Sequence, residues 1–186
     1  GELALPETTM AVLQDGTGGI HLLLPDGPPV ERGDSLRVRG VLAQESGLAE
    51  LQAVQYTVVE APPRVPDPTP LTVASAAGEP YEGQLVRVRG VVTARSDNQG
   101  GSYFVLEGQS EDADAQVTVF VAERHAERIP LDWVESGDRV SVTGIAGQFE
   151  LSYQVEPRGA DDLAAIGTGA TYLWWGLYAQ IGRAHV

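Results

Sequence analysis

A short pattern that occurs three times is the strongest constraint on how this chain folds. Each copy starts with a glycine turn, alternates apolar and polar residues, passes a second glycine and ends in apolar residues. The copies are GDSLRVRGVL at 33–42, GQLVRVRGVV at 83–92 and GDRVSVTGIA at 137–146. Alternation with period two puts every second side chain on one buried face of a strand, and an inner glycine suits a sharp bend. The repeat therefore predicts bent strands of small barrels.

The segments between the copies also read as strands and complete a repeating unit. MAVLQDG at 10–16 is similar to SYFVLEG at 102–108, each ending in an acidic residue and a glycine. The resulting order is a strand, a hairpin of two strands, a connection and two more strands. This order resembles the OB-fold, a five-stranded Greek-key barrel. The resemblance implies an all-β chain of two tandem OB-like five-stranded Greek-key barrels, the first lacking its first strand.

The resemblance also gives expected boundaries. We expect an N-terminally truncated OB-like barrel at 1–61, a Pro-rich linker at 62–80, a complete OB-like barrel at 81–158 and a tail at 159–186. The expected strands of the first barrel are 9–14, 18–24, 34–43 and 48–60; those of the second are 84–95, 102–108, 115–121, 138–146 and 148–156. A short helical connection is expected at 122–135 and a helix-like entry at 72–83. Because an incomplete barrel leaves an open edge, we interpret the start of the chain as a cut.

The C-terminal tail points to a membrane. TYLWWGLY at 171–178 is uncharged and aromatic, and Tyr and Trp are enriched at membrane–water interfaces. A spanning helix needs about 20 apolar residues, and this run stops sooner, so it is expected to be only the start of such a helix. The last six residues, IGRAHV at 181–186, read as the translation of a sequencing adapter rather than as native protein.

A second resemblance concerns the end of the complete barrel. YQVEPRGADDL at 153–163, followed by the aromatic run, resembles the extracytoplasmic region of bacterial sensor histidine kinases. It implies a sensory module outside the cytoplasm, anchored to the inner membrane by a C-terminal helix in the full-length protein. Exported nucleases carry similar strands, so an accessory domain of an exported hydrolase is an alternative.

Charge and composition bear on the partners. All 12 basic residues are arginine, and 26 acidic residues bring the net charge to −14. Such a chain repels polyphosphate over most of its surface, so nucleic acid is possible as a partner but disfavoured. The chain has no cysteine, which excludes disulfides and thiolate metal sites. The partner is expected to be an unidentified ligand or protein.

No catalytic or metal motif stands out, so we expect neither catalysis nor a cofactor. His21 is expected to be structural or on the surface, and His125 to lie on a solvated helical face; no histidine pair has zinc spacing. The acidic loops at 97–101 and 111–114 could supply oxygen ligands to calcium, but solvated turns are the preferred interpretation.

Ligand-binding residues can be proposed by comparison with OB barrels, which bind on the face of strands two and three. On that face the sequence offers Tyr103 or Phe104, since alternation allows only one of them to point outward. Arg87, Arg89 and Arg95 are expected at outward strand positions. Aromatic and basic groups together are what single-stranded nucleic acid needs, which keeps an OB-type nucleic-acid-binding module as a second hypothesis.

Overall fold

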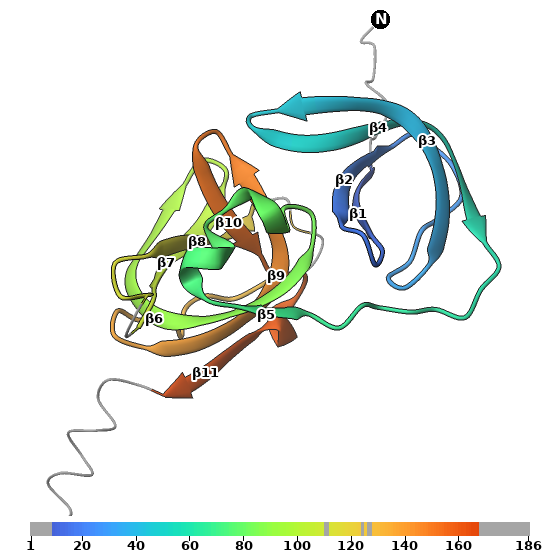
Figure 1. The fold of residues 1–186 in the computed structure, drawn as a ribbon. Coiled ribbons are helices and arrows are strands. Elements are labelled where there is room, and N and C mark those ends of the chain that lie inside the picture. Colours follow the sequence, from blue (N-terminus) through green and yellow to red (C-terminus); the bar gives the residue numbers. More distant parts are fainter. Residues whose placement is uncertain (1–8, 110–111, 124, 126–127, 168–186) are drawn as a thin grey trace, which may run out of the picture.

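The computed structural model describes residues 9–109, 112–123, 125 and 128–167, and they form two β-sheets (Figure 1). The first sheet contains β1 (Thr9–Gln14), β2 (Gly19–Leu24), β3 (Ser35–Glu45) and β4 (Leu48–Val59). The second contains β5 (Thr69–Leu71), β6 (Leu85–Asn98), β7 (Gly101–Glu107), β8 (Gln116–Ala122), β9 (Arg139–Phe149), β10 (Ser152–Glu156) and β11 (Leu163–Gly167). The expected all-β fold is confirmed.

The second sheet closes on itself because β6 pairs with two partners. Its first half is antiparallel to β9 and its second half is antiparallel to β7. The ring runs β6-β7-β8-β10-β9 and back to β6, with β8 and β10 parallel. This is the strand order of an OB-like Greek-key barrel.

The first sheet repeats most of this ring. Its order, β1-β2-β4-β3, corresponds to β7-β8-β10-β9, and its central pair, β2 and β4, is likewise parallel. No described residue takes the place of β6 between β1 and β3, so the sheet is a half-barrel. This confirms the expectation of a first barrel without its first strand.

The turn that begins each copy of the repeat requires a backbone conformation that favours glycine. Gly33, Gly83 and Gly137 each precede a strand and have φ angles of 99°, 73° and 95°, which favour glycine. In the first and third copies the aspartate that follows the glycine closes the turn. Asp34 Oδ2 accepts a hydrogen bond from the Glu31 N–H at 2.8 Å, and Asp138 Oδ2 accepts one from Glu135 N–H at 2.9 Å.

The barrel core is built from alternate positions of its strands. Phe104, Leu106, Val119, Val140 and Val142 are each 0% exposed, as expected for the inner face of a closed barrel. The helix α1 (Val73–Ala76) closes one end, with Val73 and Ala76 buried against this core. A short 3₁₀ turn (Glu79–Tyr81) follows α1, so the expected helix-like entry is confirmed.

The expected helix at 122–135 is wrong for the residues that the structure describes. None of the described residues in this range is helical, and Leu131 to Val134 form a turn in which the Val134 N–H donates to the Leu131 carbonyl at 3.0 Å. Ile129, Leu131 and Val134 are still buried in the barrel. The apolar residues of this segment are therefore buried without forming a helix. Pro130 lacks the N–H that a helix would use.

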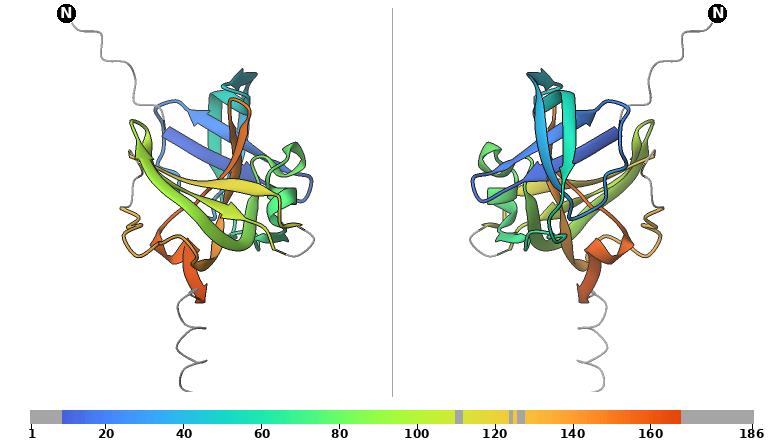
Figure 2. Two further views of the ribbon diagram at one scale, coloured as in Figure 1. Left: turned by 90° about the vertical axis from the view of Figure 1, so that its left-hand side faces the viewer. Right: turned by 90° about the vertical axis from the view of Figure 1, so that its right-hand side faces the viewer.

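The two sheets touch through β2 and β4 on one side and β9 and β10 on the other (Figures 1 and 2). Gly19 and Gly83 approach so closely that a Cβ on Gly19 would lie 1.9 Å from the Gly83 oxygen. Three side-chain hydrogen bonds link the two units, and in one of them Arg32 Nη2 donates to the Arg158 carbonyl at 3.3 Å. Gln14 Oε1 accepts from the Leu85 N–H at 2.8 Å, and Glu82 Oε1 accepts from the Ala49 N–H at 2.7 Å.

The ends of the chain are described in part. After β10, the 3₁₀ turn Ala160–Asp162 leads into β11, which pairs with β9. Asp162 forms a two-point salt bridge with Arg158 at 2.8 Å. The aromatic run at 171–178 and the final six residues lie outside the described residues. Within the described ranges, no helix has the length and apolar character needed to cross a membrane.

Candidate ligand site

The hairpin of β6 and β7 positions the candidate site, and a β-bulge shapes it. Val92 pairs with Leu106, whereas Ala94 pairs with Val105, so Thr93 is an extra residue on β6. The extra residue reverses which side chains face inward along the rest of the strand. Arg95, paired with the buried Phe104, therefore lies on the inner side of the sheet.

The tip of this hairpin is closed by an asparagine. Asn98 Oδ1 accepts hydrogen bonds from the N–H groups of Gly100 and Gly101 at 2.8 and 3.0 Å. Gly101 has a φ of 154°, and a Cβ there would lie 2.1 Å from the Val121 oxygen, so no larger residue fits. Asn98 thus has a structural role in the loop at 97–101, where oxygen ligands for calcium were considered. Within the described residues, no group of three or more metal-ligating side chains occurs.

An aromatic pair lies on the outer face of β7 and β8. Tyr103 and Phe120 are cross-strand partners, and both are partly exposed. Ser96 on β6 is the other neighbour of Tyr103, and Thr118 on β8 lies two residues from Phe120 on the same face. A Cβ on Gly100 would lie 3.5 Å from the Phe120 ring, so the pair reaches the hairpin tip.

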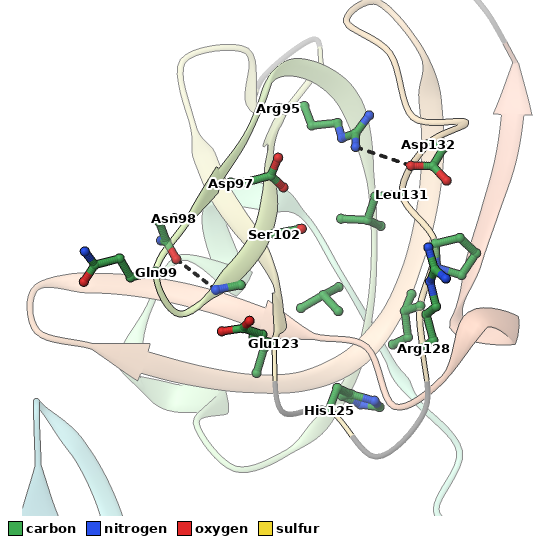
Figure 3. Close-up of a pocket in the computed structure, with 15 residues that line it drawn as sticks. Arg95, Asp97, Asn98, Gln99, Ser102, Glu123, His125, Arg128, Leu131 and Asp132 are labelled. Atoms are coloured by element: carbon green, nitrogen blue, oxygen red, sulfur yellow. Dashed lines mark hydrogen bonds and ion pairs between the residues drawn. The ribbon is translucent and has the colours of Figure 1, made fainter.

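A cavity of about 640 Å³ opens on the other side of the same hairpin (Figure 3). The hairpin contributes Arg95, Asp97 and Ser102 to its lining, and the chain after β8 contributes residues from the opposite side. The charged lining groups are Arg95, Asp97, Glu123, His125, Arg128 and Asp132. Two arginines and a histidine thus face three carboxylates, so the cavity suits neither a polyanion nor a polycation.

One ion pair spans the mouth of this cavity. Arg95 Nη2 lies 3.8 Å from Asp132 Oδ1, and the two side chains are 33% and 85% exposed. At that distance and exposure the pair contributes at most about 1 kcal/mol. Arg95 is therefore available to a ligand at little cost.

The ligand-binding residues proposed together from the sequence lie on different faces and parts of the barrel. Phe104 is wholly buried and Tyr103 points outward, which resolves the alternative between them. Arg87 and Arg89 point outward as expected, but on the half of β6 that pairs with β9, where Arg87 Nε donates to Thr143 Oγ1 at 3.2 Å. The expectation that Arg95 points outward with them is wrong, because the bulge turns it to the cavity side. Among the described residues of β7, β8 and the half of β6 that pairs with β7, no arginine lies on the outer face with Tyr103.

Sequence reasoning missed Phe120 as a site residue. The signal was present, because Val117, Val119 and Val121 alternate with Thr118 and Phe120 along β8. The three valines are buried, which leaves Phe120 on the outer face. The cavity residues after β8 had no such signal, since their positions depend on turns rather than on strand periodicity.

Comparison with known proteins gives little more. No protein-family model matches the sequence, and no curated protein sequence matches it. Among solved structures, the chain is similar to a murine DNA-binding protein bound to double-stranded DNA, with 12% identity and a TM-score of 0.37. That match covers 89% of this chain and 88% of the other. A likeness of this size does not distinguish between functions.

Proposed function

We propose that this chain is a non-enzymatic binding region whose ligand site is the β6–β7 hairpin of the second barrel. The observation that carries the proposal is the partly exposed pair Tyr103 and Phe120 on the outer face of β7 and β8. These strands are the second and third of the barrel ring, and OB barrels bind oligonucleotides and oligosaccharides on that face and its neighbouring loop. The hairpin tip at Asn98 is that loop.

The surroundings of the pair favour an uncharged, hydroxyl-rich ligand. Aromatic rings offer a flat apolar surface, and the neighbours on the same face are uncharged: Ser96 and Thr118 carry hydroxyl groups, and Val105 is apolar. Single-stranded nucleic acid needs a basic groove beside its stacking rings, but Arg87 and Arg89 lie on the β9 half of β6. With a net charge of −14, the chain also repels polyphosphate. An oligosaccharide meets these conditions best.

Nucleic acid is the second candidate, and a specific observation favours it. Arg95 and Arg128 line the cavity on the other side of the hairpin from Tyr103. A strand that passed over the hairpin tip would meet both rings and arginines. The three carboxylates of the same cavity weigh against this route.

In the full-length protein we place this region outside the cytoplasm, as the input part of a membrane-bound signalling protein. The support is the uncharged aromatic run at 171–178 and the resemblance of 153–163 to sensor histidine kinases. An accessory domain of an exported hydrolase is the alternative. The complete gene decides: an apolar span and signalling domains downstream support the first, and a hydrolase domain supports the second.

The binding proposal is tested by titrating the chain with neutral oligosaccharides from a glycan array and measuring affinity by calorimetry. Tyr103→Ala and Phe120→Ala should each weaken binding by about fivefold or more, as for a residue at the centre of an interface. Phe149→Ala is the matched control, because Phe149 is an exposed aromatic residue (56%) at the end of β9. Equal loss in all three variants, or no oligosaccharide bound at all, would contradict the proposal.

A parallel titration with labelled oligo-dT separates the second candidate. Binding at about 50 mM salt that weakens steeply at about 200 mM would indicate phosphate contacts. Loss of that binding in Arg95→Ala and Arg128→Ala would establish nucleic acid as the ligand. We expect no such binding.

A further inference from the structure

A histidine is buried where the half-barrel meets the barrel. His21 lies on the side of β2 that faces the second sheet and is 6% exposed. Its Nε2 atom is buried and has no hydrogen-bond partner among the described residues. An unpaired polar atom in such a place is destabilising, so a charged neighbour is expected to compensate for it.

Two carboxyl groups lie beside this histidine, one from each sheet: Glu50 is buried and Glu156 is half-buried. Glu50 on β4 is the cross-strand neighbour of His21 and is 5% exposed. Glu156 on β10 comes from the barrel. A methyl group on Gly147 would lie 3.5 Å from Glu156 Oε1 and 3.7 Å from His21 Nε2. The two side chains therefore border one small space that Gly147 leaves open.

The environment of Glu156 favours its protonated form. Burial raises the pKa of this carboxyl above its ordinary value of 4.5, although the His21 charge and the hydrogen bond from Gln154 act in the opposite direction. Gln154 Nε2 donates that bond to Glu156 Oε1 at 2.7 Å. The charge of His125, on the chain after β8, also acts on Glu156 and lowers its pKa.

A further acidic group lies in the same contact region. Glu82 Oε1 accepts the Ala49 N–H at 2.7 Å, and its Oε2 atom is buried without a hydrogen-bond partner among the described residues. Glu50, Glu82 and Glu156 thus bring three carboxyl groups to the contact around His21. A proton held between His21 and Glu156 offsets part of their negative charge.

We propose that the contact between the half-barrel and the barrel is proton-dependent, tightening when the His21–Glu156 pair holds a proton and loosening when it loses it. Burial raises the pKa of the Glu156 carboxyl, so this group stabilises the contact most below its ordinary pKa and least above its raised pKa. The two sheets should therefore separate more readily as the pH rises.

Amide hydrogen exchange on the full chain tests this proposal directly. The Leu85 and Ala49 N–H groups donate across the contact, so their protection reports how often it opens. After correction for intrinsic exchange, their protection should fall severalfold between about pH 5 and 8, as the Glu156 carboxyl with its raised pKa loses its proton. Val119, inside the barrel core, should keep its protection.

Two neutral variants decide the outcome. Glu156→Gln and His21→Gln should each flatten the pH dependence at Leu85 and Ala49, whereas Glu60→Gln, an exposed carboxylate after β4, should leave it unchanged. If His21→Gln opens the contact at every pH, Glu156→Gln alone decides. Protection that is independent of pH in the unmodified chain, or a dependence that survives in Glu156→Gln, would overturn the proposal.

Discussion

The half-barrel and the barrel share four strands in the same order, yet the same positions are buried to different depths. In β9, the inner residues Val140 and Val142 are 0% exposed. In β3, the strand with the same place in the ring, Leu36 and Val38 are only partly buried, and Leu42 is 68% exposed although it pairs with Leu51 on the inner face. The difference is β6, which covers the inner residues of the barrel. The presence or absence of this one strand therefore decides whether the sheet has a closed core or stays open.

The largest effect should come from the closed core. Phe104→Ala removes a wholly buried ring and should lower the free energy of unfolding of the barrel by about 3–5 kcal/mol. Tyr103→Ala, one residue away on the outer face, should cost much less. Chemical denaturation followed by circular dichroism measures both, and similar losses would mean that the two faces are not as different as described.

Supplying the absent strand should make the two regions more alike. A synthetic copy of β6, residues 85–98, should bind the half-barrel and protect the amides of both β1 and β3 from exchange. At a free concentration 100-fold above its dissociation constant, it should stabilise the half-barrel by about 2.7 kcal/mol.

The control peptide carries aspartate at the positions of Val86 and Val88, which are wholly buried in the barrel, and it should not bind. If only the amides of β1 became protected, the peptide would have paired with one edge of the first sheet without closing it into a barrel.

The smallest effect concerns the end of the barrel beyond β10, which is anchored by the Arg158–Asp162 pair. Burial alone would raise the pKa of Asp162, but the hydrogen bonds and charge of Arg158 outweigh burial and hold this pKa below its ordinary value of 3.8. The pair therefore stabilises the fold above about pH 4, and this contribution is lost as the pH falls through the lowered pKa. Asp162→Asn should cost about 1 kcal/mol or less, since solvent screens the pair.

The measurement for Asp162→Asn is thermal unfolding at pH 7 and at pH 2.5. The variant should be less stable than the unmodified chain at the higher pH, and the difference should be smaller at the lower one. A difference that is the same at both values would mean that the carboxylate charge is not what anchors this segment.

Much of the fold could be predicted from the sequence because strand alternation and glycine turns are local signals. The strands expected for both units lie within four residues of their observed boundaries, although β5 and β11 were not expected, and the half-barrel follows from the repeat. The domain boundaries and the membrane segment stay predictions. The prediction of a helix at 122–135 was wrong because a turn can also bury residues three positions apart, such as Leu131 and Val134.

The candidate site was harder to predict, for a different physical reason. Thr93 looks like any other strand residue, and only its pairing shows that it is extra. The extra residue changes which side of the sheet Arg95 faces. A strict alternation with period two predicts the opposite side. Phe120 was within reach of sequence reasoning, whereas the face shared by Tyr103 and Phe120 depends on the pairing of β7 with β8.

The bulge at Thr93 has a consequence for how such a site could change over evolutionary time. A single-codon deletion of Thr93 would remove the bulge but keep every pairing from Ala94 onward, so Arg95 would stay on the cavity side. If Thr93 instead paired normally and the extra residue moved to the hairpin tip, Arg95 would pair with Tyr103, and the cavity would lose a cation without any change of residue type. Because the buried part of β6 ends at Val92, the barrel core would be left as it is. In this hairpin, the position of one extra residue sets ligand chemistry as strongly as amino-acid identity does.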